Sequence, residues 1–253
     1  MNPAEFDRMF EIEETHWWYR GRRSLVRHAL DTHVLPNRGG GEEALEILDV
    51  ACATGMSFRF LNDYGNIRGV DISEETIEYC GRRGIDRIVR ADAVHLPFGE
   101  ESFDVVLALD AFEHFDDDKL AMSESYRVLR PGGVLVVTVP AFMILWSPHD
   151  DAYHHKRRYR RPQLRKRLLA AGFDVERMSY STMSLFPPVL ALRTLRRLVV
   201  KEETEVASDF ALSFPRPIEA LADFVTRLEL AVERKVDLPF GVSLFGVVRK
   251  PAS

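Results

Sequence analysis

Short apolar runs rich in β-branched residues alternate with longer stretches of amphipathic spacing along most of this chain. The short runs predict strands, and the longer stretches between them predict helices. Because the two alternate, the pattern favours the α/β class, a doubly wound and mostly parallel seven-stranded sheet with helices on both faces. The predicted strands are Ala44–Val50, Ile67–Asp71, Arg87–Arg90, Phe103–Leu109, Gly133–Val139, Phe173–Tyr180 and Val242–Arg249.

The helices are predicted from apolar residues three and four positions apart and from signals at their ends. Ser73 is placed as an N-cap, and Gly172 as the residue that follows another helix. The run Arg130-Pro131-Gly132-Gly133 ends the helix before the fifth strand. The predicted helices are His16–Val34, Met56–Tyr64, Glu74–Arg83, Lys119–Leu129, Arg161–Ala171, Val189–Val200 and Ile218–Glu233.

The same pattern divides the chain into four segments. The stretch 37–43 (NRGGGEE) is typical of a flexible connection, and the stretch between the last two strands is too long for a structureless loop. We therefore expect an N-terminal helical lid at 1–41 and an α/β core at 42–180. A helical cap insertion follows at 181–241, and the last strand of the core lies within 242–253.

Composition narrows the class of protein. The chain has 253 residues, of which 46% are hydrophobic and 29% charged, and its net charge is −5. These values are typical of a globular protein and give no indication of nucleic-acid binding. Two cysteines cannot form a disulfide framework, and the acidic N-terminal residues leave no room for a signal peptide. We expect a cytoplasmic protein, with a peripheral membrane contact left open.

Candidate chemistry follows the predicted strands, because ligands of parallel sheets bind beyond the strands' carboxyl ends. Asp71 ends the second strand, where a carboxylate can accept hydrogen bonds from both hydroxyls of a ribose. Asp92 follows the third strand and can accept from an exocyclic amine such as that of adenine. Small residues at 51–55 let the backbone approach a ligand. A strand-terminal aspartate alone is more often a cap or turn residue, but the ordered set indicates a nucleoside site.

Five segments together resemble the class I S-adenosylmethionine-dependent methyltransferases that act on small molecules: LDVACATG, GVDIS, ADAVHLPF, FDVVLALDAFEHF and RVLRPGGVLVVTVP. The resemblance is close over residues 42–140 and implies an antiparallel last strand and S-adenosylmethionine as cofactor. It implies that Asp49 and the turn to Gly55 hold the methionine end, that Asp71 takes the ribose, and that Asp92 faces the adenine. The full set of expected cofactor-binding residues is Tyr19, Asp49, Ala51, Cys52, Ala53, Gly55, Asp71, Ile72, Asp92, Ala93, Leu109 and Asp110.

One departure from the family pattern keeps a second function open. The family usually has glycine where this chain has Ala51 and Ala53, and of three glycines only Gly55 remains. Alanine adds methyl groups beside the ligand and disfavours positive φ. The alternative is a methyltransferase fold repurposed as a non-methylating enzyme of the cyclase or lyase type, or as a ligand-binding protein.

His114 and His149 are the candidates for a general base. They follow the fourth and fifth strands, near the point where a methyl group would be transferred. A histidine there can take a proton from an oxygen or nitrogen nucleophile. A structural role for His114 is the alternative, and an amine or thiolate acceptor needs no base at all.

A basic segment follows the fifth strand. Residues 150–167 hold eight Lys or Arg and two Asp, so Arg157 and Arg158 are candidates to recognise an anionic acceptor. A solvated helix start is the alternative. The nearby set His149, Asp150, His154 and His155 has no characteristic ligand spacing, so we predict no bound metal.

Two aromatic segments lie outside the core motifs. Trp17, Trp18 and Tyr19 stand beside arginines and suit a lid over a ligand, from which Tyr19 or Arg23 reaches the cofactor. The segment 186–197, with its prolines and arginines, fits either a membrane surface or a cap over the substrate, of which we favour the cap. The sequence therefore predicts a methyltransferase for a small, anionic or lipid-linked acceptor.

Overall fold

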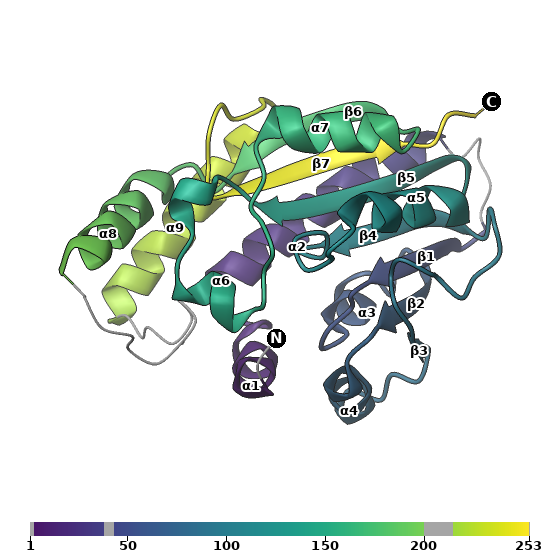
Figure 1. Cartoon of the computed structure of the whole chain (residues 1–253), viewed down its shortest axis with the longest axis horizontal. Helices are drawn as coiled ribbons and strands as arrows, with labels where there is room; N and C mark the ends of the chain where they lie inside the picture. Colours follow the sequence, from purple (N-terminus) through teal and green to yellow (C-terminus); the bar gives the residue numbers. More distant parts are fainter. Residues whose placement is uncertain (1–2, 38–42, 200–214, 253) are drawn as a thin grey trace.

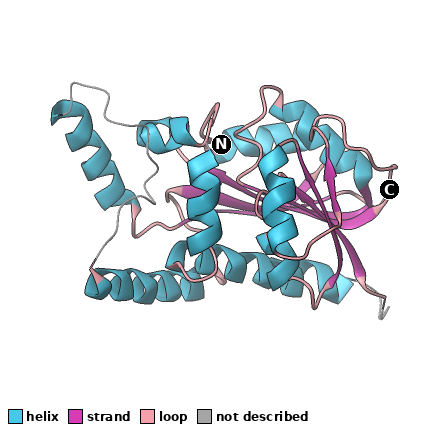
Figure 2. Ribbon diagram, turned by 90° about the horizontal axis from the view of Figure 1, so that it is seen from below, coloured by secondary structure: helices cyan, strands magenta, loops and turns pink. Residues whose placement is uncertain are grey.

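The computed structural model describes residues 3–37, 43–199 and 215–252. In these ranges seven strands form one sheet in the order β3-β2-β1-β4-β5-β7-β6 (Figure 1). Helices cover both faces of the sheet (Figure 2). The strands are β1 Leu45–Val50, β2 Gly65–Asp71, β3 Ile88–Arg90, β4 Phe103–Leu109, β5 Leu129–Pro140, β6 Asp174–Ser181 and β7 Ser243–Arg249.

The strand directions confirm the predicted doubly wound class. Strands β1 to β5 pair in parallel, whereas β7 is antiparallel to both of its neighbours, β5 and β6. Strands β2 and β3 lie on one side of β1 in the sheet, and β4 and β5, which come later in the chain, lie on its other side. Such a reversal leaves a crevice at the carboxyl ends of the strands on either side of it.

Side chains that alternate along the strands build two apolar layers. Leu48 of β1 and Val106 of β4 face one layer, while Ile47 and Val105 face the other. Helices α5 and α7 supply the first layer, and α2 with α3 supplies the second. The helices are α1 Pro3–Ile12, α2 Trp17–Ala29, α3 Met56–Phe60, α4 Glu74–Arg82, α5 Asp118–Val128, α6 Pro148–Ala152, α7 Arg161–Ala170, α8 Phe186–Val199 and α9 Arg216–Glu233.

The structure differs from the predicted elements in several places, and smaller shifts of bounds include α3, which ends at Phe60 rather than Tyr64, and α8, which begins at Phe186 rather than Val189. Helices α1 and α6 were not predicted, and the predicted helix His16–Val34 ends as an α-helix at Ala29 and continues as a single π-turn. Strand β5 begins at Leu129 rather than Gly133, because the glycines continue the strand while Gly132 N donates to Lys250 O at 2.9 Å. Residues 38–42 of the predicted connection and residues 200–214 of the predicted cap insertion lie outside the described ranges.

None of the helices in the described ranges has the length and apolar character that crossing a bilayer requires. Cys52 and Cys80 are both buried as free thiols.

Candidate functional site

A cavity of about 1290 Å³ lies at the carboxyl ends of β1, β2 and β4. Gly55 does not line it, because this residue packs behind the turn, where an added Cβ would lie 2.8 Å from Cys80 Sγ. The candidate bases His114 and His149 both line the cavity. The other predicted cofactor residues also line it: Tyr19, Asp49, Ala51, Cys52, Ala53, Asp71, Ile72, Asp92, Ala93, Leu109 and Asp110.

The turn between β1 and α3 is built from three left-handed residues. Ala51, Ala53 and Gly55 have φ values of 57°, 45° and 72°. For alanine this conformation costs roughly 1–2 kcal/mol per residue. Backbone contacts hold the turn in place, since Cys52 N donates to Val70 O at 3.2 Å and Gly55 N donates to Cys52 O at 2.8 Å. The chain therefore keeps a glycine-type turn without two of its glycines.

Asp71 is oriented by the backbone around it. Its two carboxylate oxygens accept hydrogen bonds from Ala53 N at 3.0 Å and Ser73 N at 2.9 Å. Each oxygen keeps a further lone pair, so the carboxylate can still accept from the two hydroxyls of a ribose. Asp92 is exposed and accepts from Val94 N at 3.1 Å. Asp71 and Asp92 therefore both lie at the carboxyl-end edge of the sheet, and both can accept further hydrogen bonds.

Asp49 lies at the base of the turn and is 5% exposed. Ser57 Oγ donates to its carboxylate at 2.5 Å. Burial, reinforced by the neighbouring charge of Asp71, raises the pKa of Asp49 to about 7. A cationic group bound beside Asp49 would favour its ionised form, as the amino group of a methionine moiety would.

Two residues that the sequence did not single out connect the N-terminal helices to this site. Glu13, between α1 and α2, accepts from Thr54 Oγ1 at 2.5 Å and from Arg83 Nη2 at 2.6 Å. Arg22 of α2 forms an ion pair with Asp110 at the end of β4. Arg23, the predicted cofactor contact, lines the cavity but donates to Glu13 O and to Glu14 O.

The basic segment is compensated inside the fold. Arg158 is 5% exposed, and its guanidinium donates to Asp150 at 2.7 and 3.0 Å. Arg157 lies 3.0 Å from Asp118, which also pairs with Arg167. The prediction that Arg157 and Arg158 recognise an anionic acceptor is therefore not supported, because carboxylates of the chain already occupy both guanidiniums.

Buried titratable groups gather where β4 ends. Glu113 is fully buried, and burial raises its pKa to about 8. Burial, together with the neighbouring His155, lowers the pKa of His114 to about 3. His114 is therefore neutral near pH 7, but so low a pKa makes it a weak general base. The ring of His149 lies 4.6 Å from that of Tyr153, between centroids.

The far side of the cavity is apolar. Pro188, Val189 and Leu192 of α8 line it together with Ile218 and Ala222 of α9. Arg193 of α8 is buried, and its guanidinium donates to Leu145 O. These contacts favour a role as a cap on the cavity, rather than membrane binding, for the start of α8. The side chains of residues 196–199 lie outside the described set.

Comparisons with known proteins agree with this geometry. Residues 48–137 match the family described as "Methyltransferase domain". A probable S-adenosylmethionine-dependent methyltransferase of Mycolicibacterium smegmatis is 32% identical over 171 residues, 65% of this chain and 62% of that protein. The sterol 24-C-methyltransferase of Schizosaccharomyces pombe is 31% identical over 47% of this chain and 34% of its own length. The chain thus spans less than two thirds of these curated relatives.

A solved structure shows the same fold. The [4+2]-cyclase SpnF has a TM-score of 0.58 and 22% identity over 93% of this chain and 83% of its own. At that identity the likeness concerns the fold alone. Taken with the motifs at the carboxyl ends of β1, β2 and β4, these findings confirm that residues 48–137 are similar to the methyltransferase domain family and that the chain resembles S-adenosylmethionine-dependent methyltransferases.

Proposed function

We propose that this chain transfers a methyl group from S-adenosylmethionine to a small molecule with an extended apolar part. The observation that carries this proposal is one cavity that joins Asp71 and Asp92 to the apolar residues of α8 and α9. Its volume of about 1290 Å³ exceeds the roughly 300–1,000 Å³ of an ordinary ligand pocket. It therefore has room for a cofactor and an acceptor together.

The residues divide between the two ligands. Asp71 takes the ribose hydroxyls, Asp92 and Ala93 face the adenine, and Asp49 with the turn at 51–55 holds the methionine part. Leu109 and Asp110 form the floor, and Tyr19 covers the cofactor from α2. In this arrangement segment 1–41 acts as the lid, 42–180 with 242–253 as the core and 181–241 as the cap.

Apolar contact selects the acceptor. Arg157 and Arg158 of the basic segment are paired with carboxylates, whereas Leu192, Ile218 and Ala222 offer apolar surface at the cavity's far side. A sterol methyltransferase among the relatives acts on an acceptor of this type. Where the attacked atom carries a proton, His149 is the candidate that accepts it, because a pKa of about 3 makes His114 a weak base; a thiolate or free amine needs positioning only.

Calorimetric titration and a transfer assay test the proposal. We expect the purified chain to bind S-adenosylmethionine and its demethylated product at a single site. It should then transfer a labelled methyl group to apolar acceptors such as sterols or prenylated quinols in preference to small water-soluble amines. Absence of binding for both cofactor forms would contradict the proposal.

A non-methylating enzyme or a ligand-binding protein is the second candidate. The specific observation is the pair Ala51 and Ala53, whose methyl groups line the cavity at left-handed positions. The SpnF cyclase shares the fold. In such a protein the turn would be shaped for a ligand other than an intact methyl donor.

Replacing Ala51 and Ala53 together by glycine separates the two candidates. Because glycine relieves about 1–2 kcal/mol of left-handed strain but loosens the unfolded chain by about 0.4–1 kcal/mol per site, we expect the free energy of unfolding to rise by up to about 3 kcal/mol for the two sites together. A methyltransferase should keep its S-adenosylmethionine affinity or gain up to about tenfold. Weaker binding without methyl transfer would favour the second candidate. Ala170→Gly, at the exposed last position of helix α7, is the control and should cost no more than about 1 kcal/mol.

A further inference from the structure

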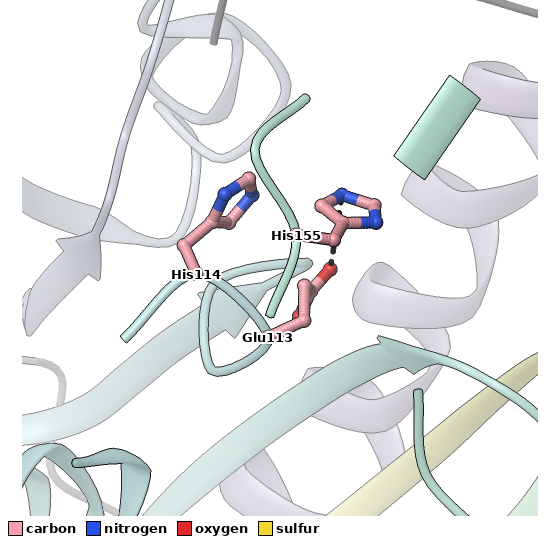
Figure 3. Close-up of side chains that lie close together, drawn as sticks. All are labelled: Glu113, His114 and His155. Carbon is pink, nitrogen blue, oxygen red and sulfur yellow. Dashed lines mark ion pairs between the residues drawn. The ribbon is translucent and has the colours of Figure 1, made fainter. Parts of the chain in front are cut away.

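Three potential metal ligands converge in the wall of the cavity. Glu113 and His114 lie on the loop after β4, and His155 lies on the loop after α6 (Figure 3). One ligand atom from each lies within 4.8 Å of the other two, and His155 Nε2 is 4.0 Å from Glu113 Oε1. All three residues line the cavity, so the point between them is accessible to a bound molecule.

The Glu113 carboxylate lacks the partners that a buried acid normally has. Its exposed fraction is 0%, and neither oxygen forms a hydrogen bond with another residue of the described chain. Buried polar atoms are almost always hydrogen-bonded, because desolvation without a partner costs about 1–3 kcal/mol and more for a charged group. A buried carboxylate without hydrogen-bond partners from other residues therefore indicates that Glu113 binds a cation or a hydrogen-bond donor from outside the chain.

Both histidines are oriented by a second contact. His155 Nδ1 lies 2.9 Å from Asp150 Oδ1, which leaves Nε2 directed toward Glu113. The His114 ring is hydrogen-bonded to the backbone of Tyr153. Histidines that bind metals almost always use their other nitrogen in a hydrogen bond to a carboxylate or carbonyl, which fixes the tautomer and the ring. This feature distinguishes the cluster from a chance meeting of polar side chains.

The local charge also suits a cation. Arg22 pairs with Asp110, and Arg158 pairs with Asp150, so the nearest guanidiniums are each matched by a carboxylate. A cation bound here displaces the proton of Glu113, and the carboxylate then supplies one negative charge that neither guanidinium matches. Two imidazole nitrogens and one carboxylate oxygen are the donor set of catalytic zinc and of non-haem iron sites, whereas Mg²⁺ and Ca²⁺ prefer oxygen donors.

We propose that Glu113, His114 and His155 bind one divalent transition-metal ion, of the Zn²⁺ or Fe²⁺ type, in the wall of the cavity. Ligand atoms about 2.0–2.1 Å from such an ion are roughly 3.3 Å apart, so side-chain shifts of the order of 1 Å close the site. Three protein ligands leave a coordination position open toward the cavity, where a water molecule binds. In the proposed methyl transfer, an oxygen, nitrogen or sulfur atom of the acceptor replaces this water. This step rests on the proposed function.

Metal titration of the untagged full-length chain tests the site. After chelator treatment and gel filtration, we expect calorimetry with Zn²⁺ to give one equivalent per chain, and Co²⁺ to show the visible absorption bands of a low-coordinate ion. Glu113→Gln keeps the shape of the buried side chain and removes the anionic donor. Mutation of a residue that only hydrogen-bonds to a metal-binding side chain typically lowers metal affinity 10- to 100-fold. Glu113→Gln and His114→Ala each remove a metal-binding atom itself, so each should lower Zn²⁺ affinity by at least about 100-fold.

His154→Ala is the matched control, because this exposed histidine adjoins His155 but lies outside the cluster. It should bind Zn²⁺ as the parent chain does. Failure of the parent to bind either ion, or equal binding by Glu113→Gln, would overturn the metal site. Titration of the same samples with S-adenosylmethionine reports separately on the proposed function, because the cofactor residues Asp71 and Asp92 lie outside the cluster.

Discussion

Replacing Arg158 by methionine is expected to destabilise the folded chain by about 3–5 kcal/mol, the cost of removing one partner of a buried ion pair. Asp150 is fully buried and receives two hydrogen bonds from the guanidinium, at 2.7 and 3.0 Å. Burial alone would raise the pKa of Asp150, but the hydrogen bond with His155 and the charge of Arg158 hold it well below its usual value. Without Arg158 the fold must bury a poorly compensated charge.

Chemical denaturation of the parent and the variant measures this loss as a lower unfolding midpoint at unchanged slope. Arg165→Met is the control. This residue is exposed on α7, and its replacement should change the free energy of unfolding by no more than about 0.5 kcal/mol. A stable Arg158→Met protein whose only defect is weak acceptor binding would restore the anion-recognition role that the structure argues against.

Replacing Asp71 by alanine is expected to weaken S-adenosylmethionine binding by about 10- to 100-fold. The carboxylate is positioned to accept two ribose hydroxyls, and a hydrogen bond to a charged group contributes about 1.5–3 kcal/mol. Alanine also removes the acceptor for Ala53 N and Ser73 N, so the turn beside the cofactor loses two of its anchors. Asp71→Asn retains one acceptor oxygen and should fall between the parent and the alanine variant.

Calorimetric titration with the cofactor compares these proteins, and thermal unfolding verifies that each is folded. Asp86→Ala replaces an exposed aspartate that does not line the cavity and should bind like the parent chain. If Asp71→Ala and Asp86→Ala bind the cofactor equally well, the ribose assignment is wrong.

Local sequence patterns were sufficient for the sheet and for placing Asp71 and Asp92 at the carboxyl ends of their strands. β4 was predicted with its observed bounds, because the apolar run 103–109 is enclosed by polar and breaker residues. Asp71 and Asp92 were predicted as site residues because a strand end is a local feature whose position in the fold follows from topology. Helix α1 carried a signal that was not used: Phe6, Met9 and Phe10 recur at helical spacing.

The other half of the site depends on contacts between distant parts of the chain. Glu13 meets Thr54 and Arg83, which lie 41 and 70 residues away, so no local pattern could connect them. The basic segment shows the converse. The excess of positive charge in residues 150–167 was counted correctly from the sequence. Asp118 of α5 pairs with Arg157 and Arg167 of this segment, and only the tertiary fold shows these pairs.

The place of β7 has a consequence for how this protein is made. As the nascent chain leaves the ribosome, β5 emerges long before its partner β7, which follows the entire segment of α8 and α9. Until residues 243–249 are synthesised, β5 has an open edge and β6 has no neighbour, since β7 is the only strand that joins them in the described chain. Open strand edges attract other chains. Slow translation through the α8–α9 region should therefore lengthen the period of exposure to aggregation, and a chaperone that covers β5 would shorten it.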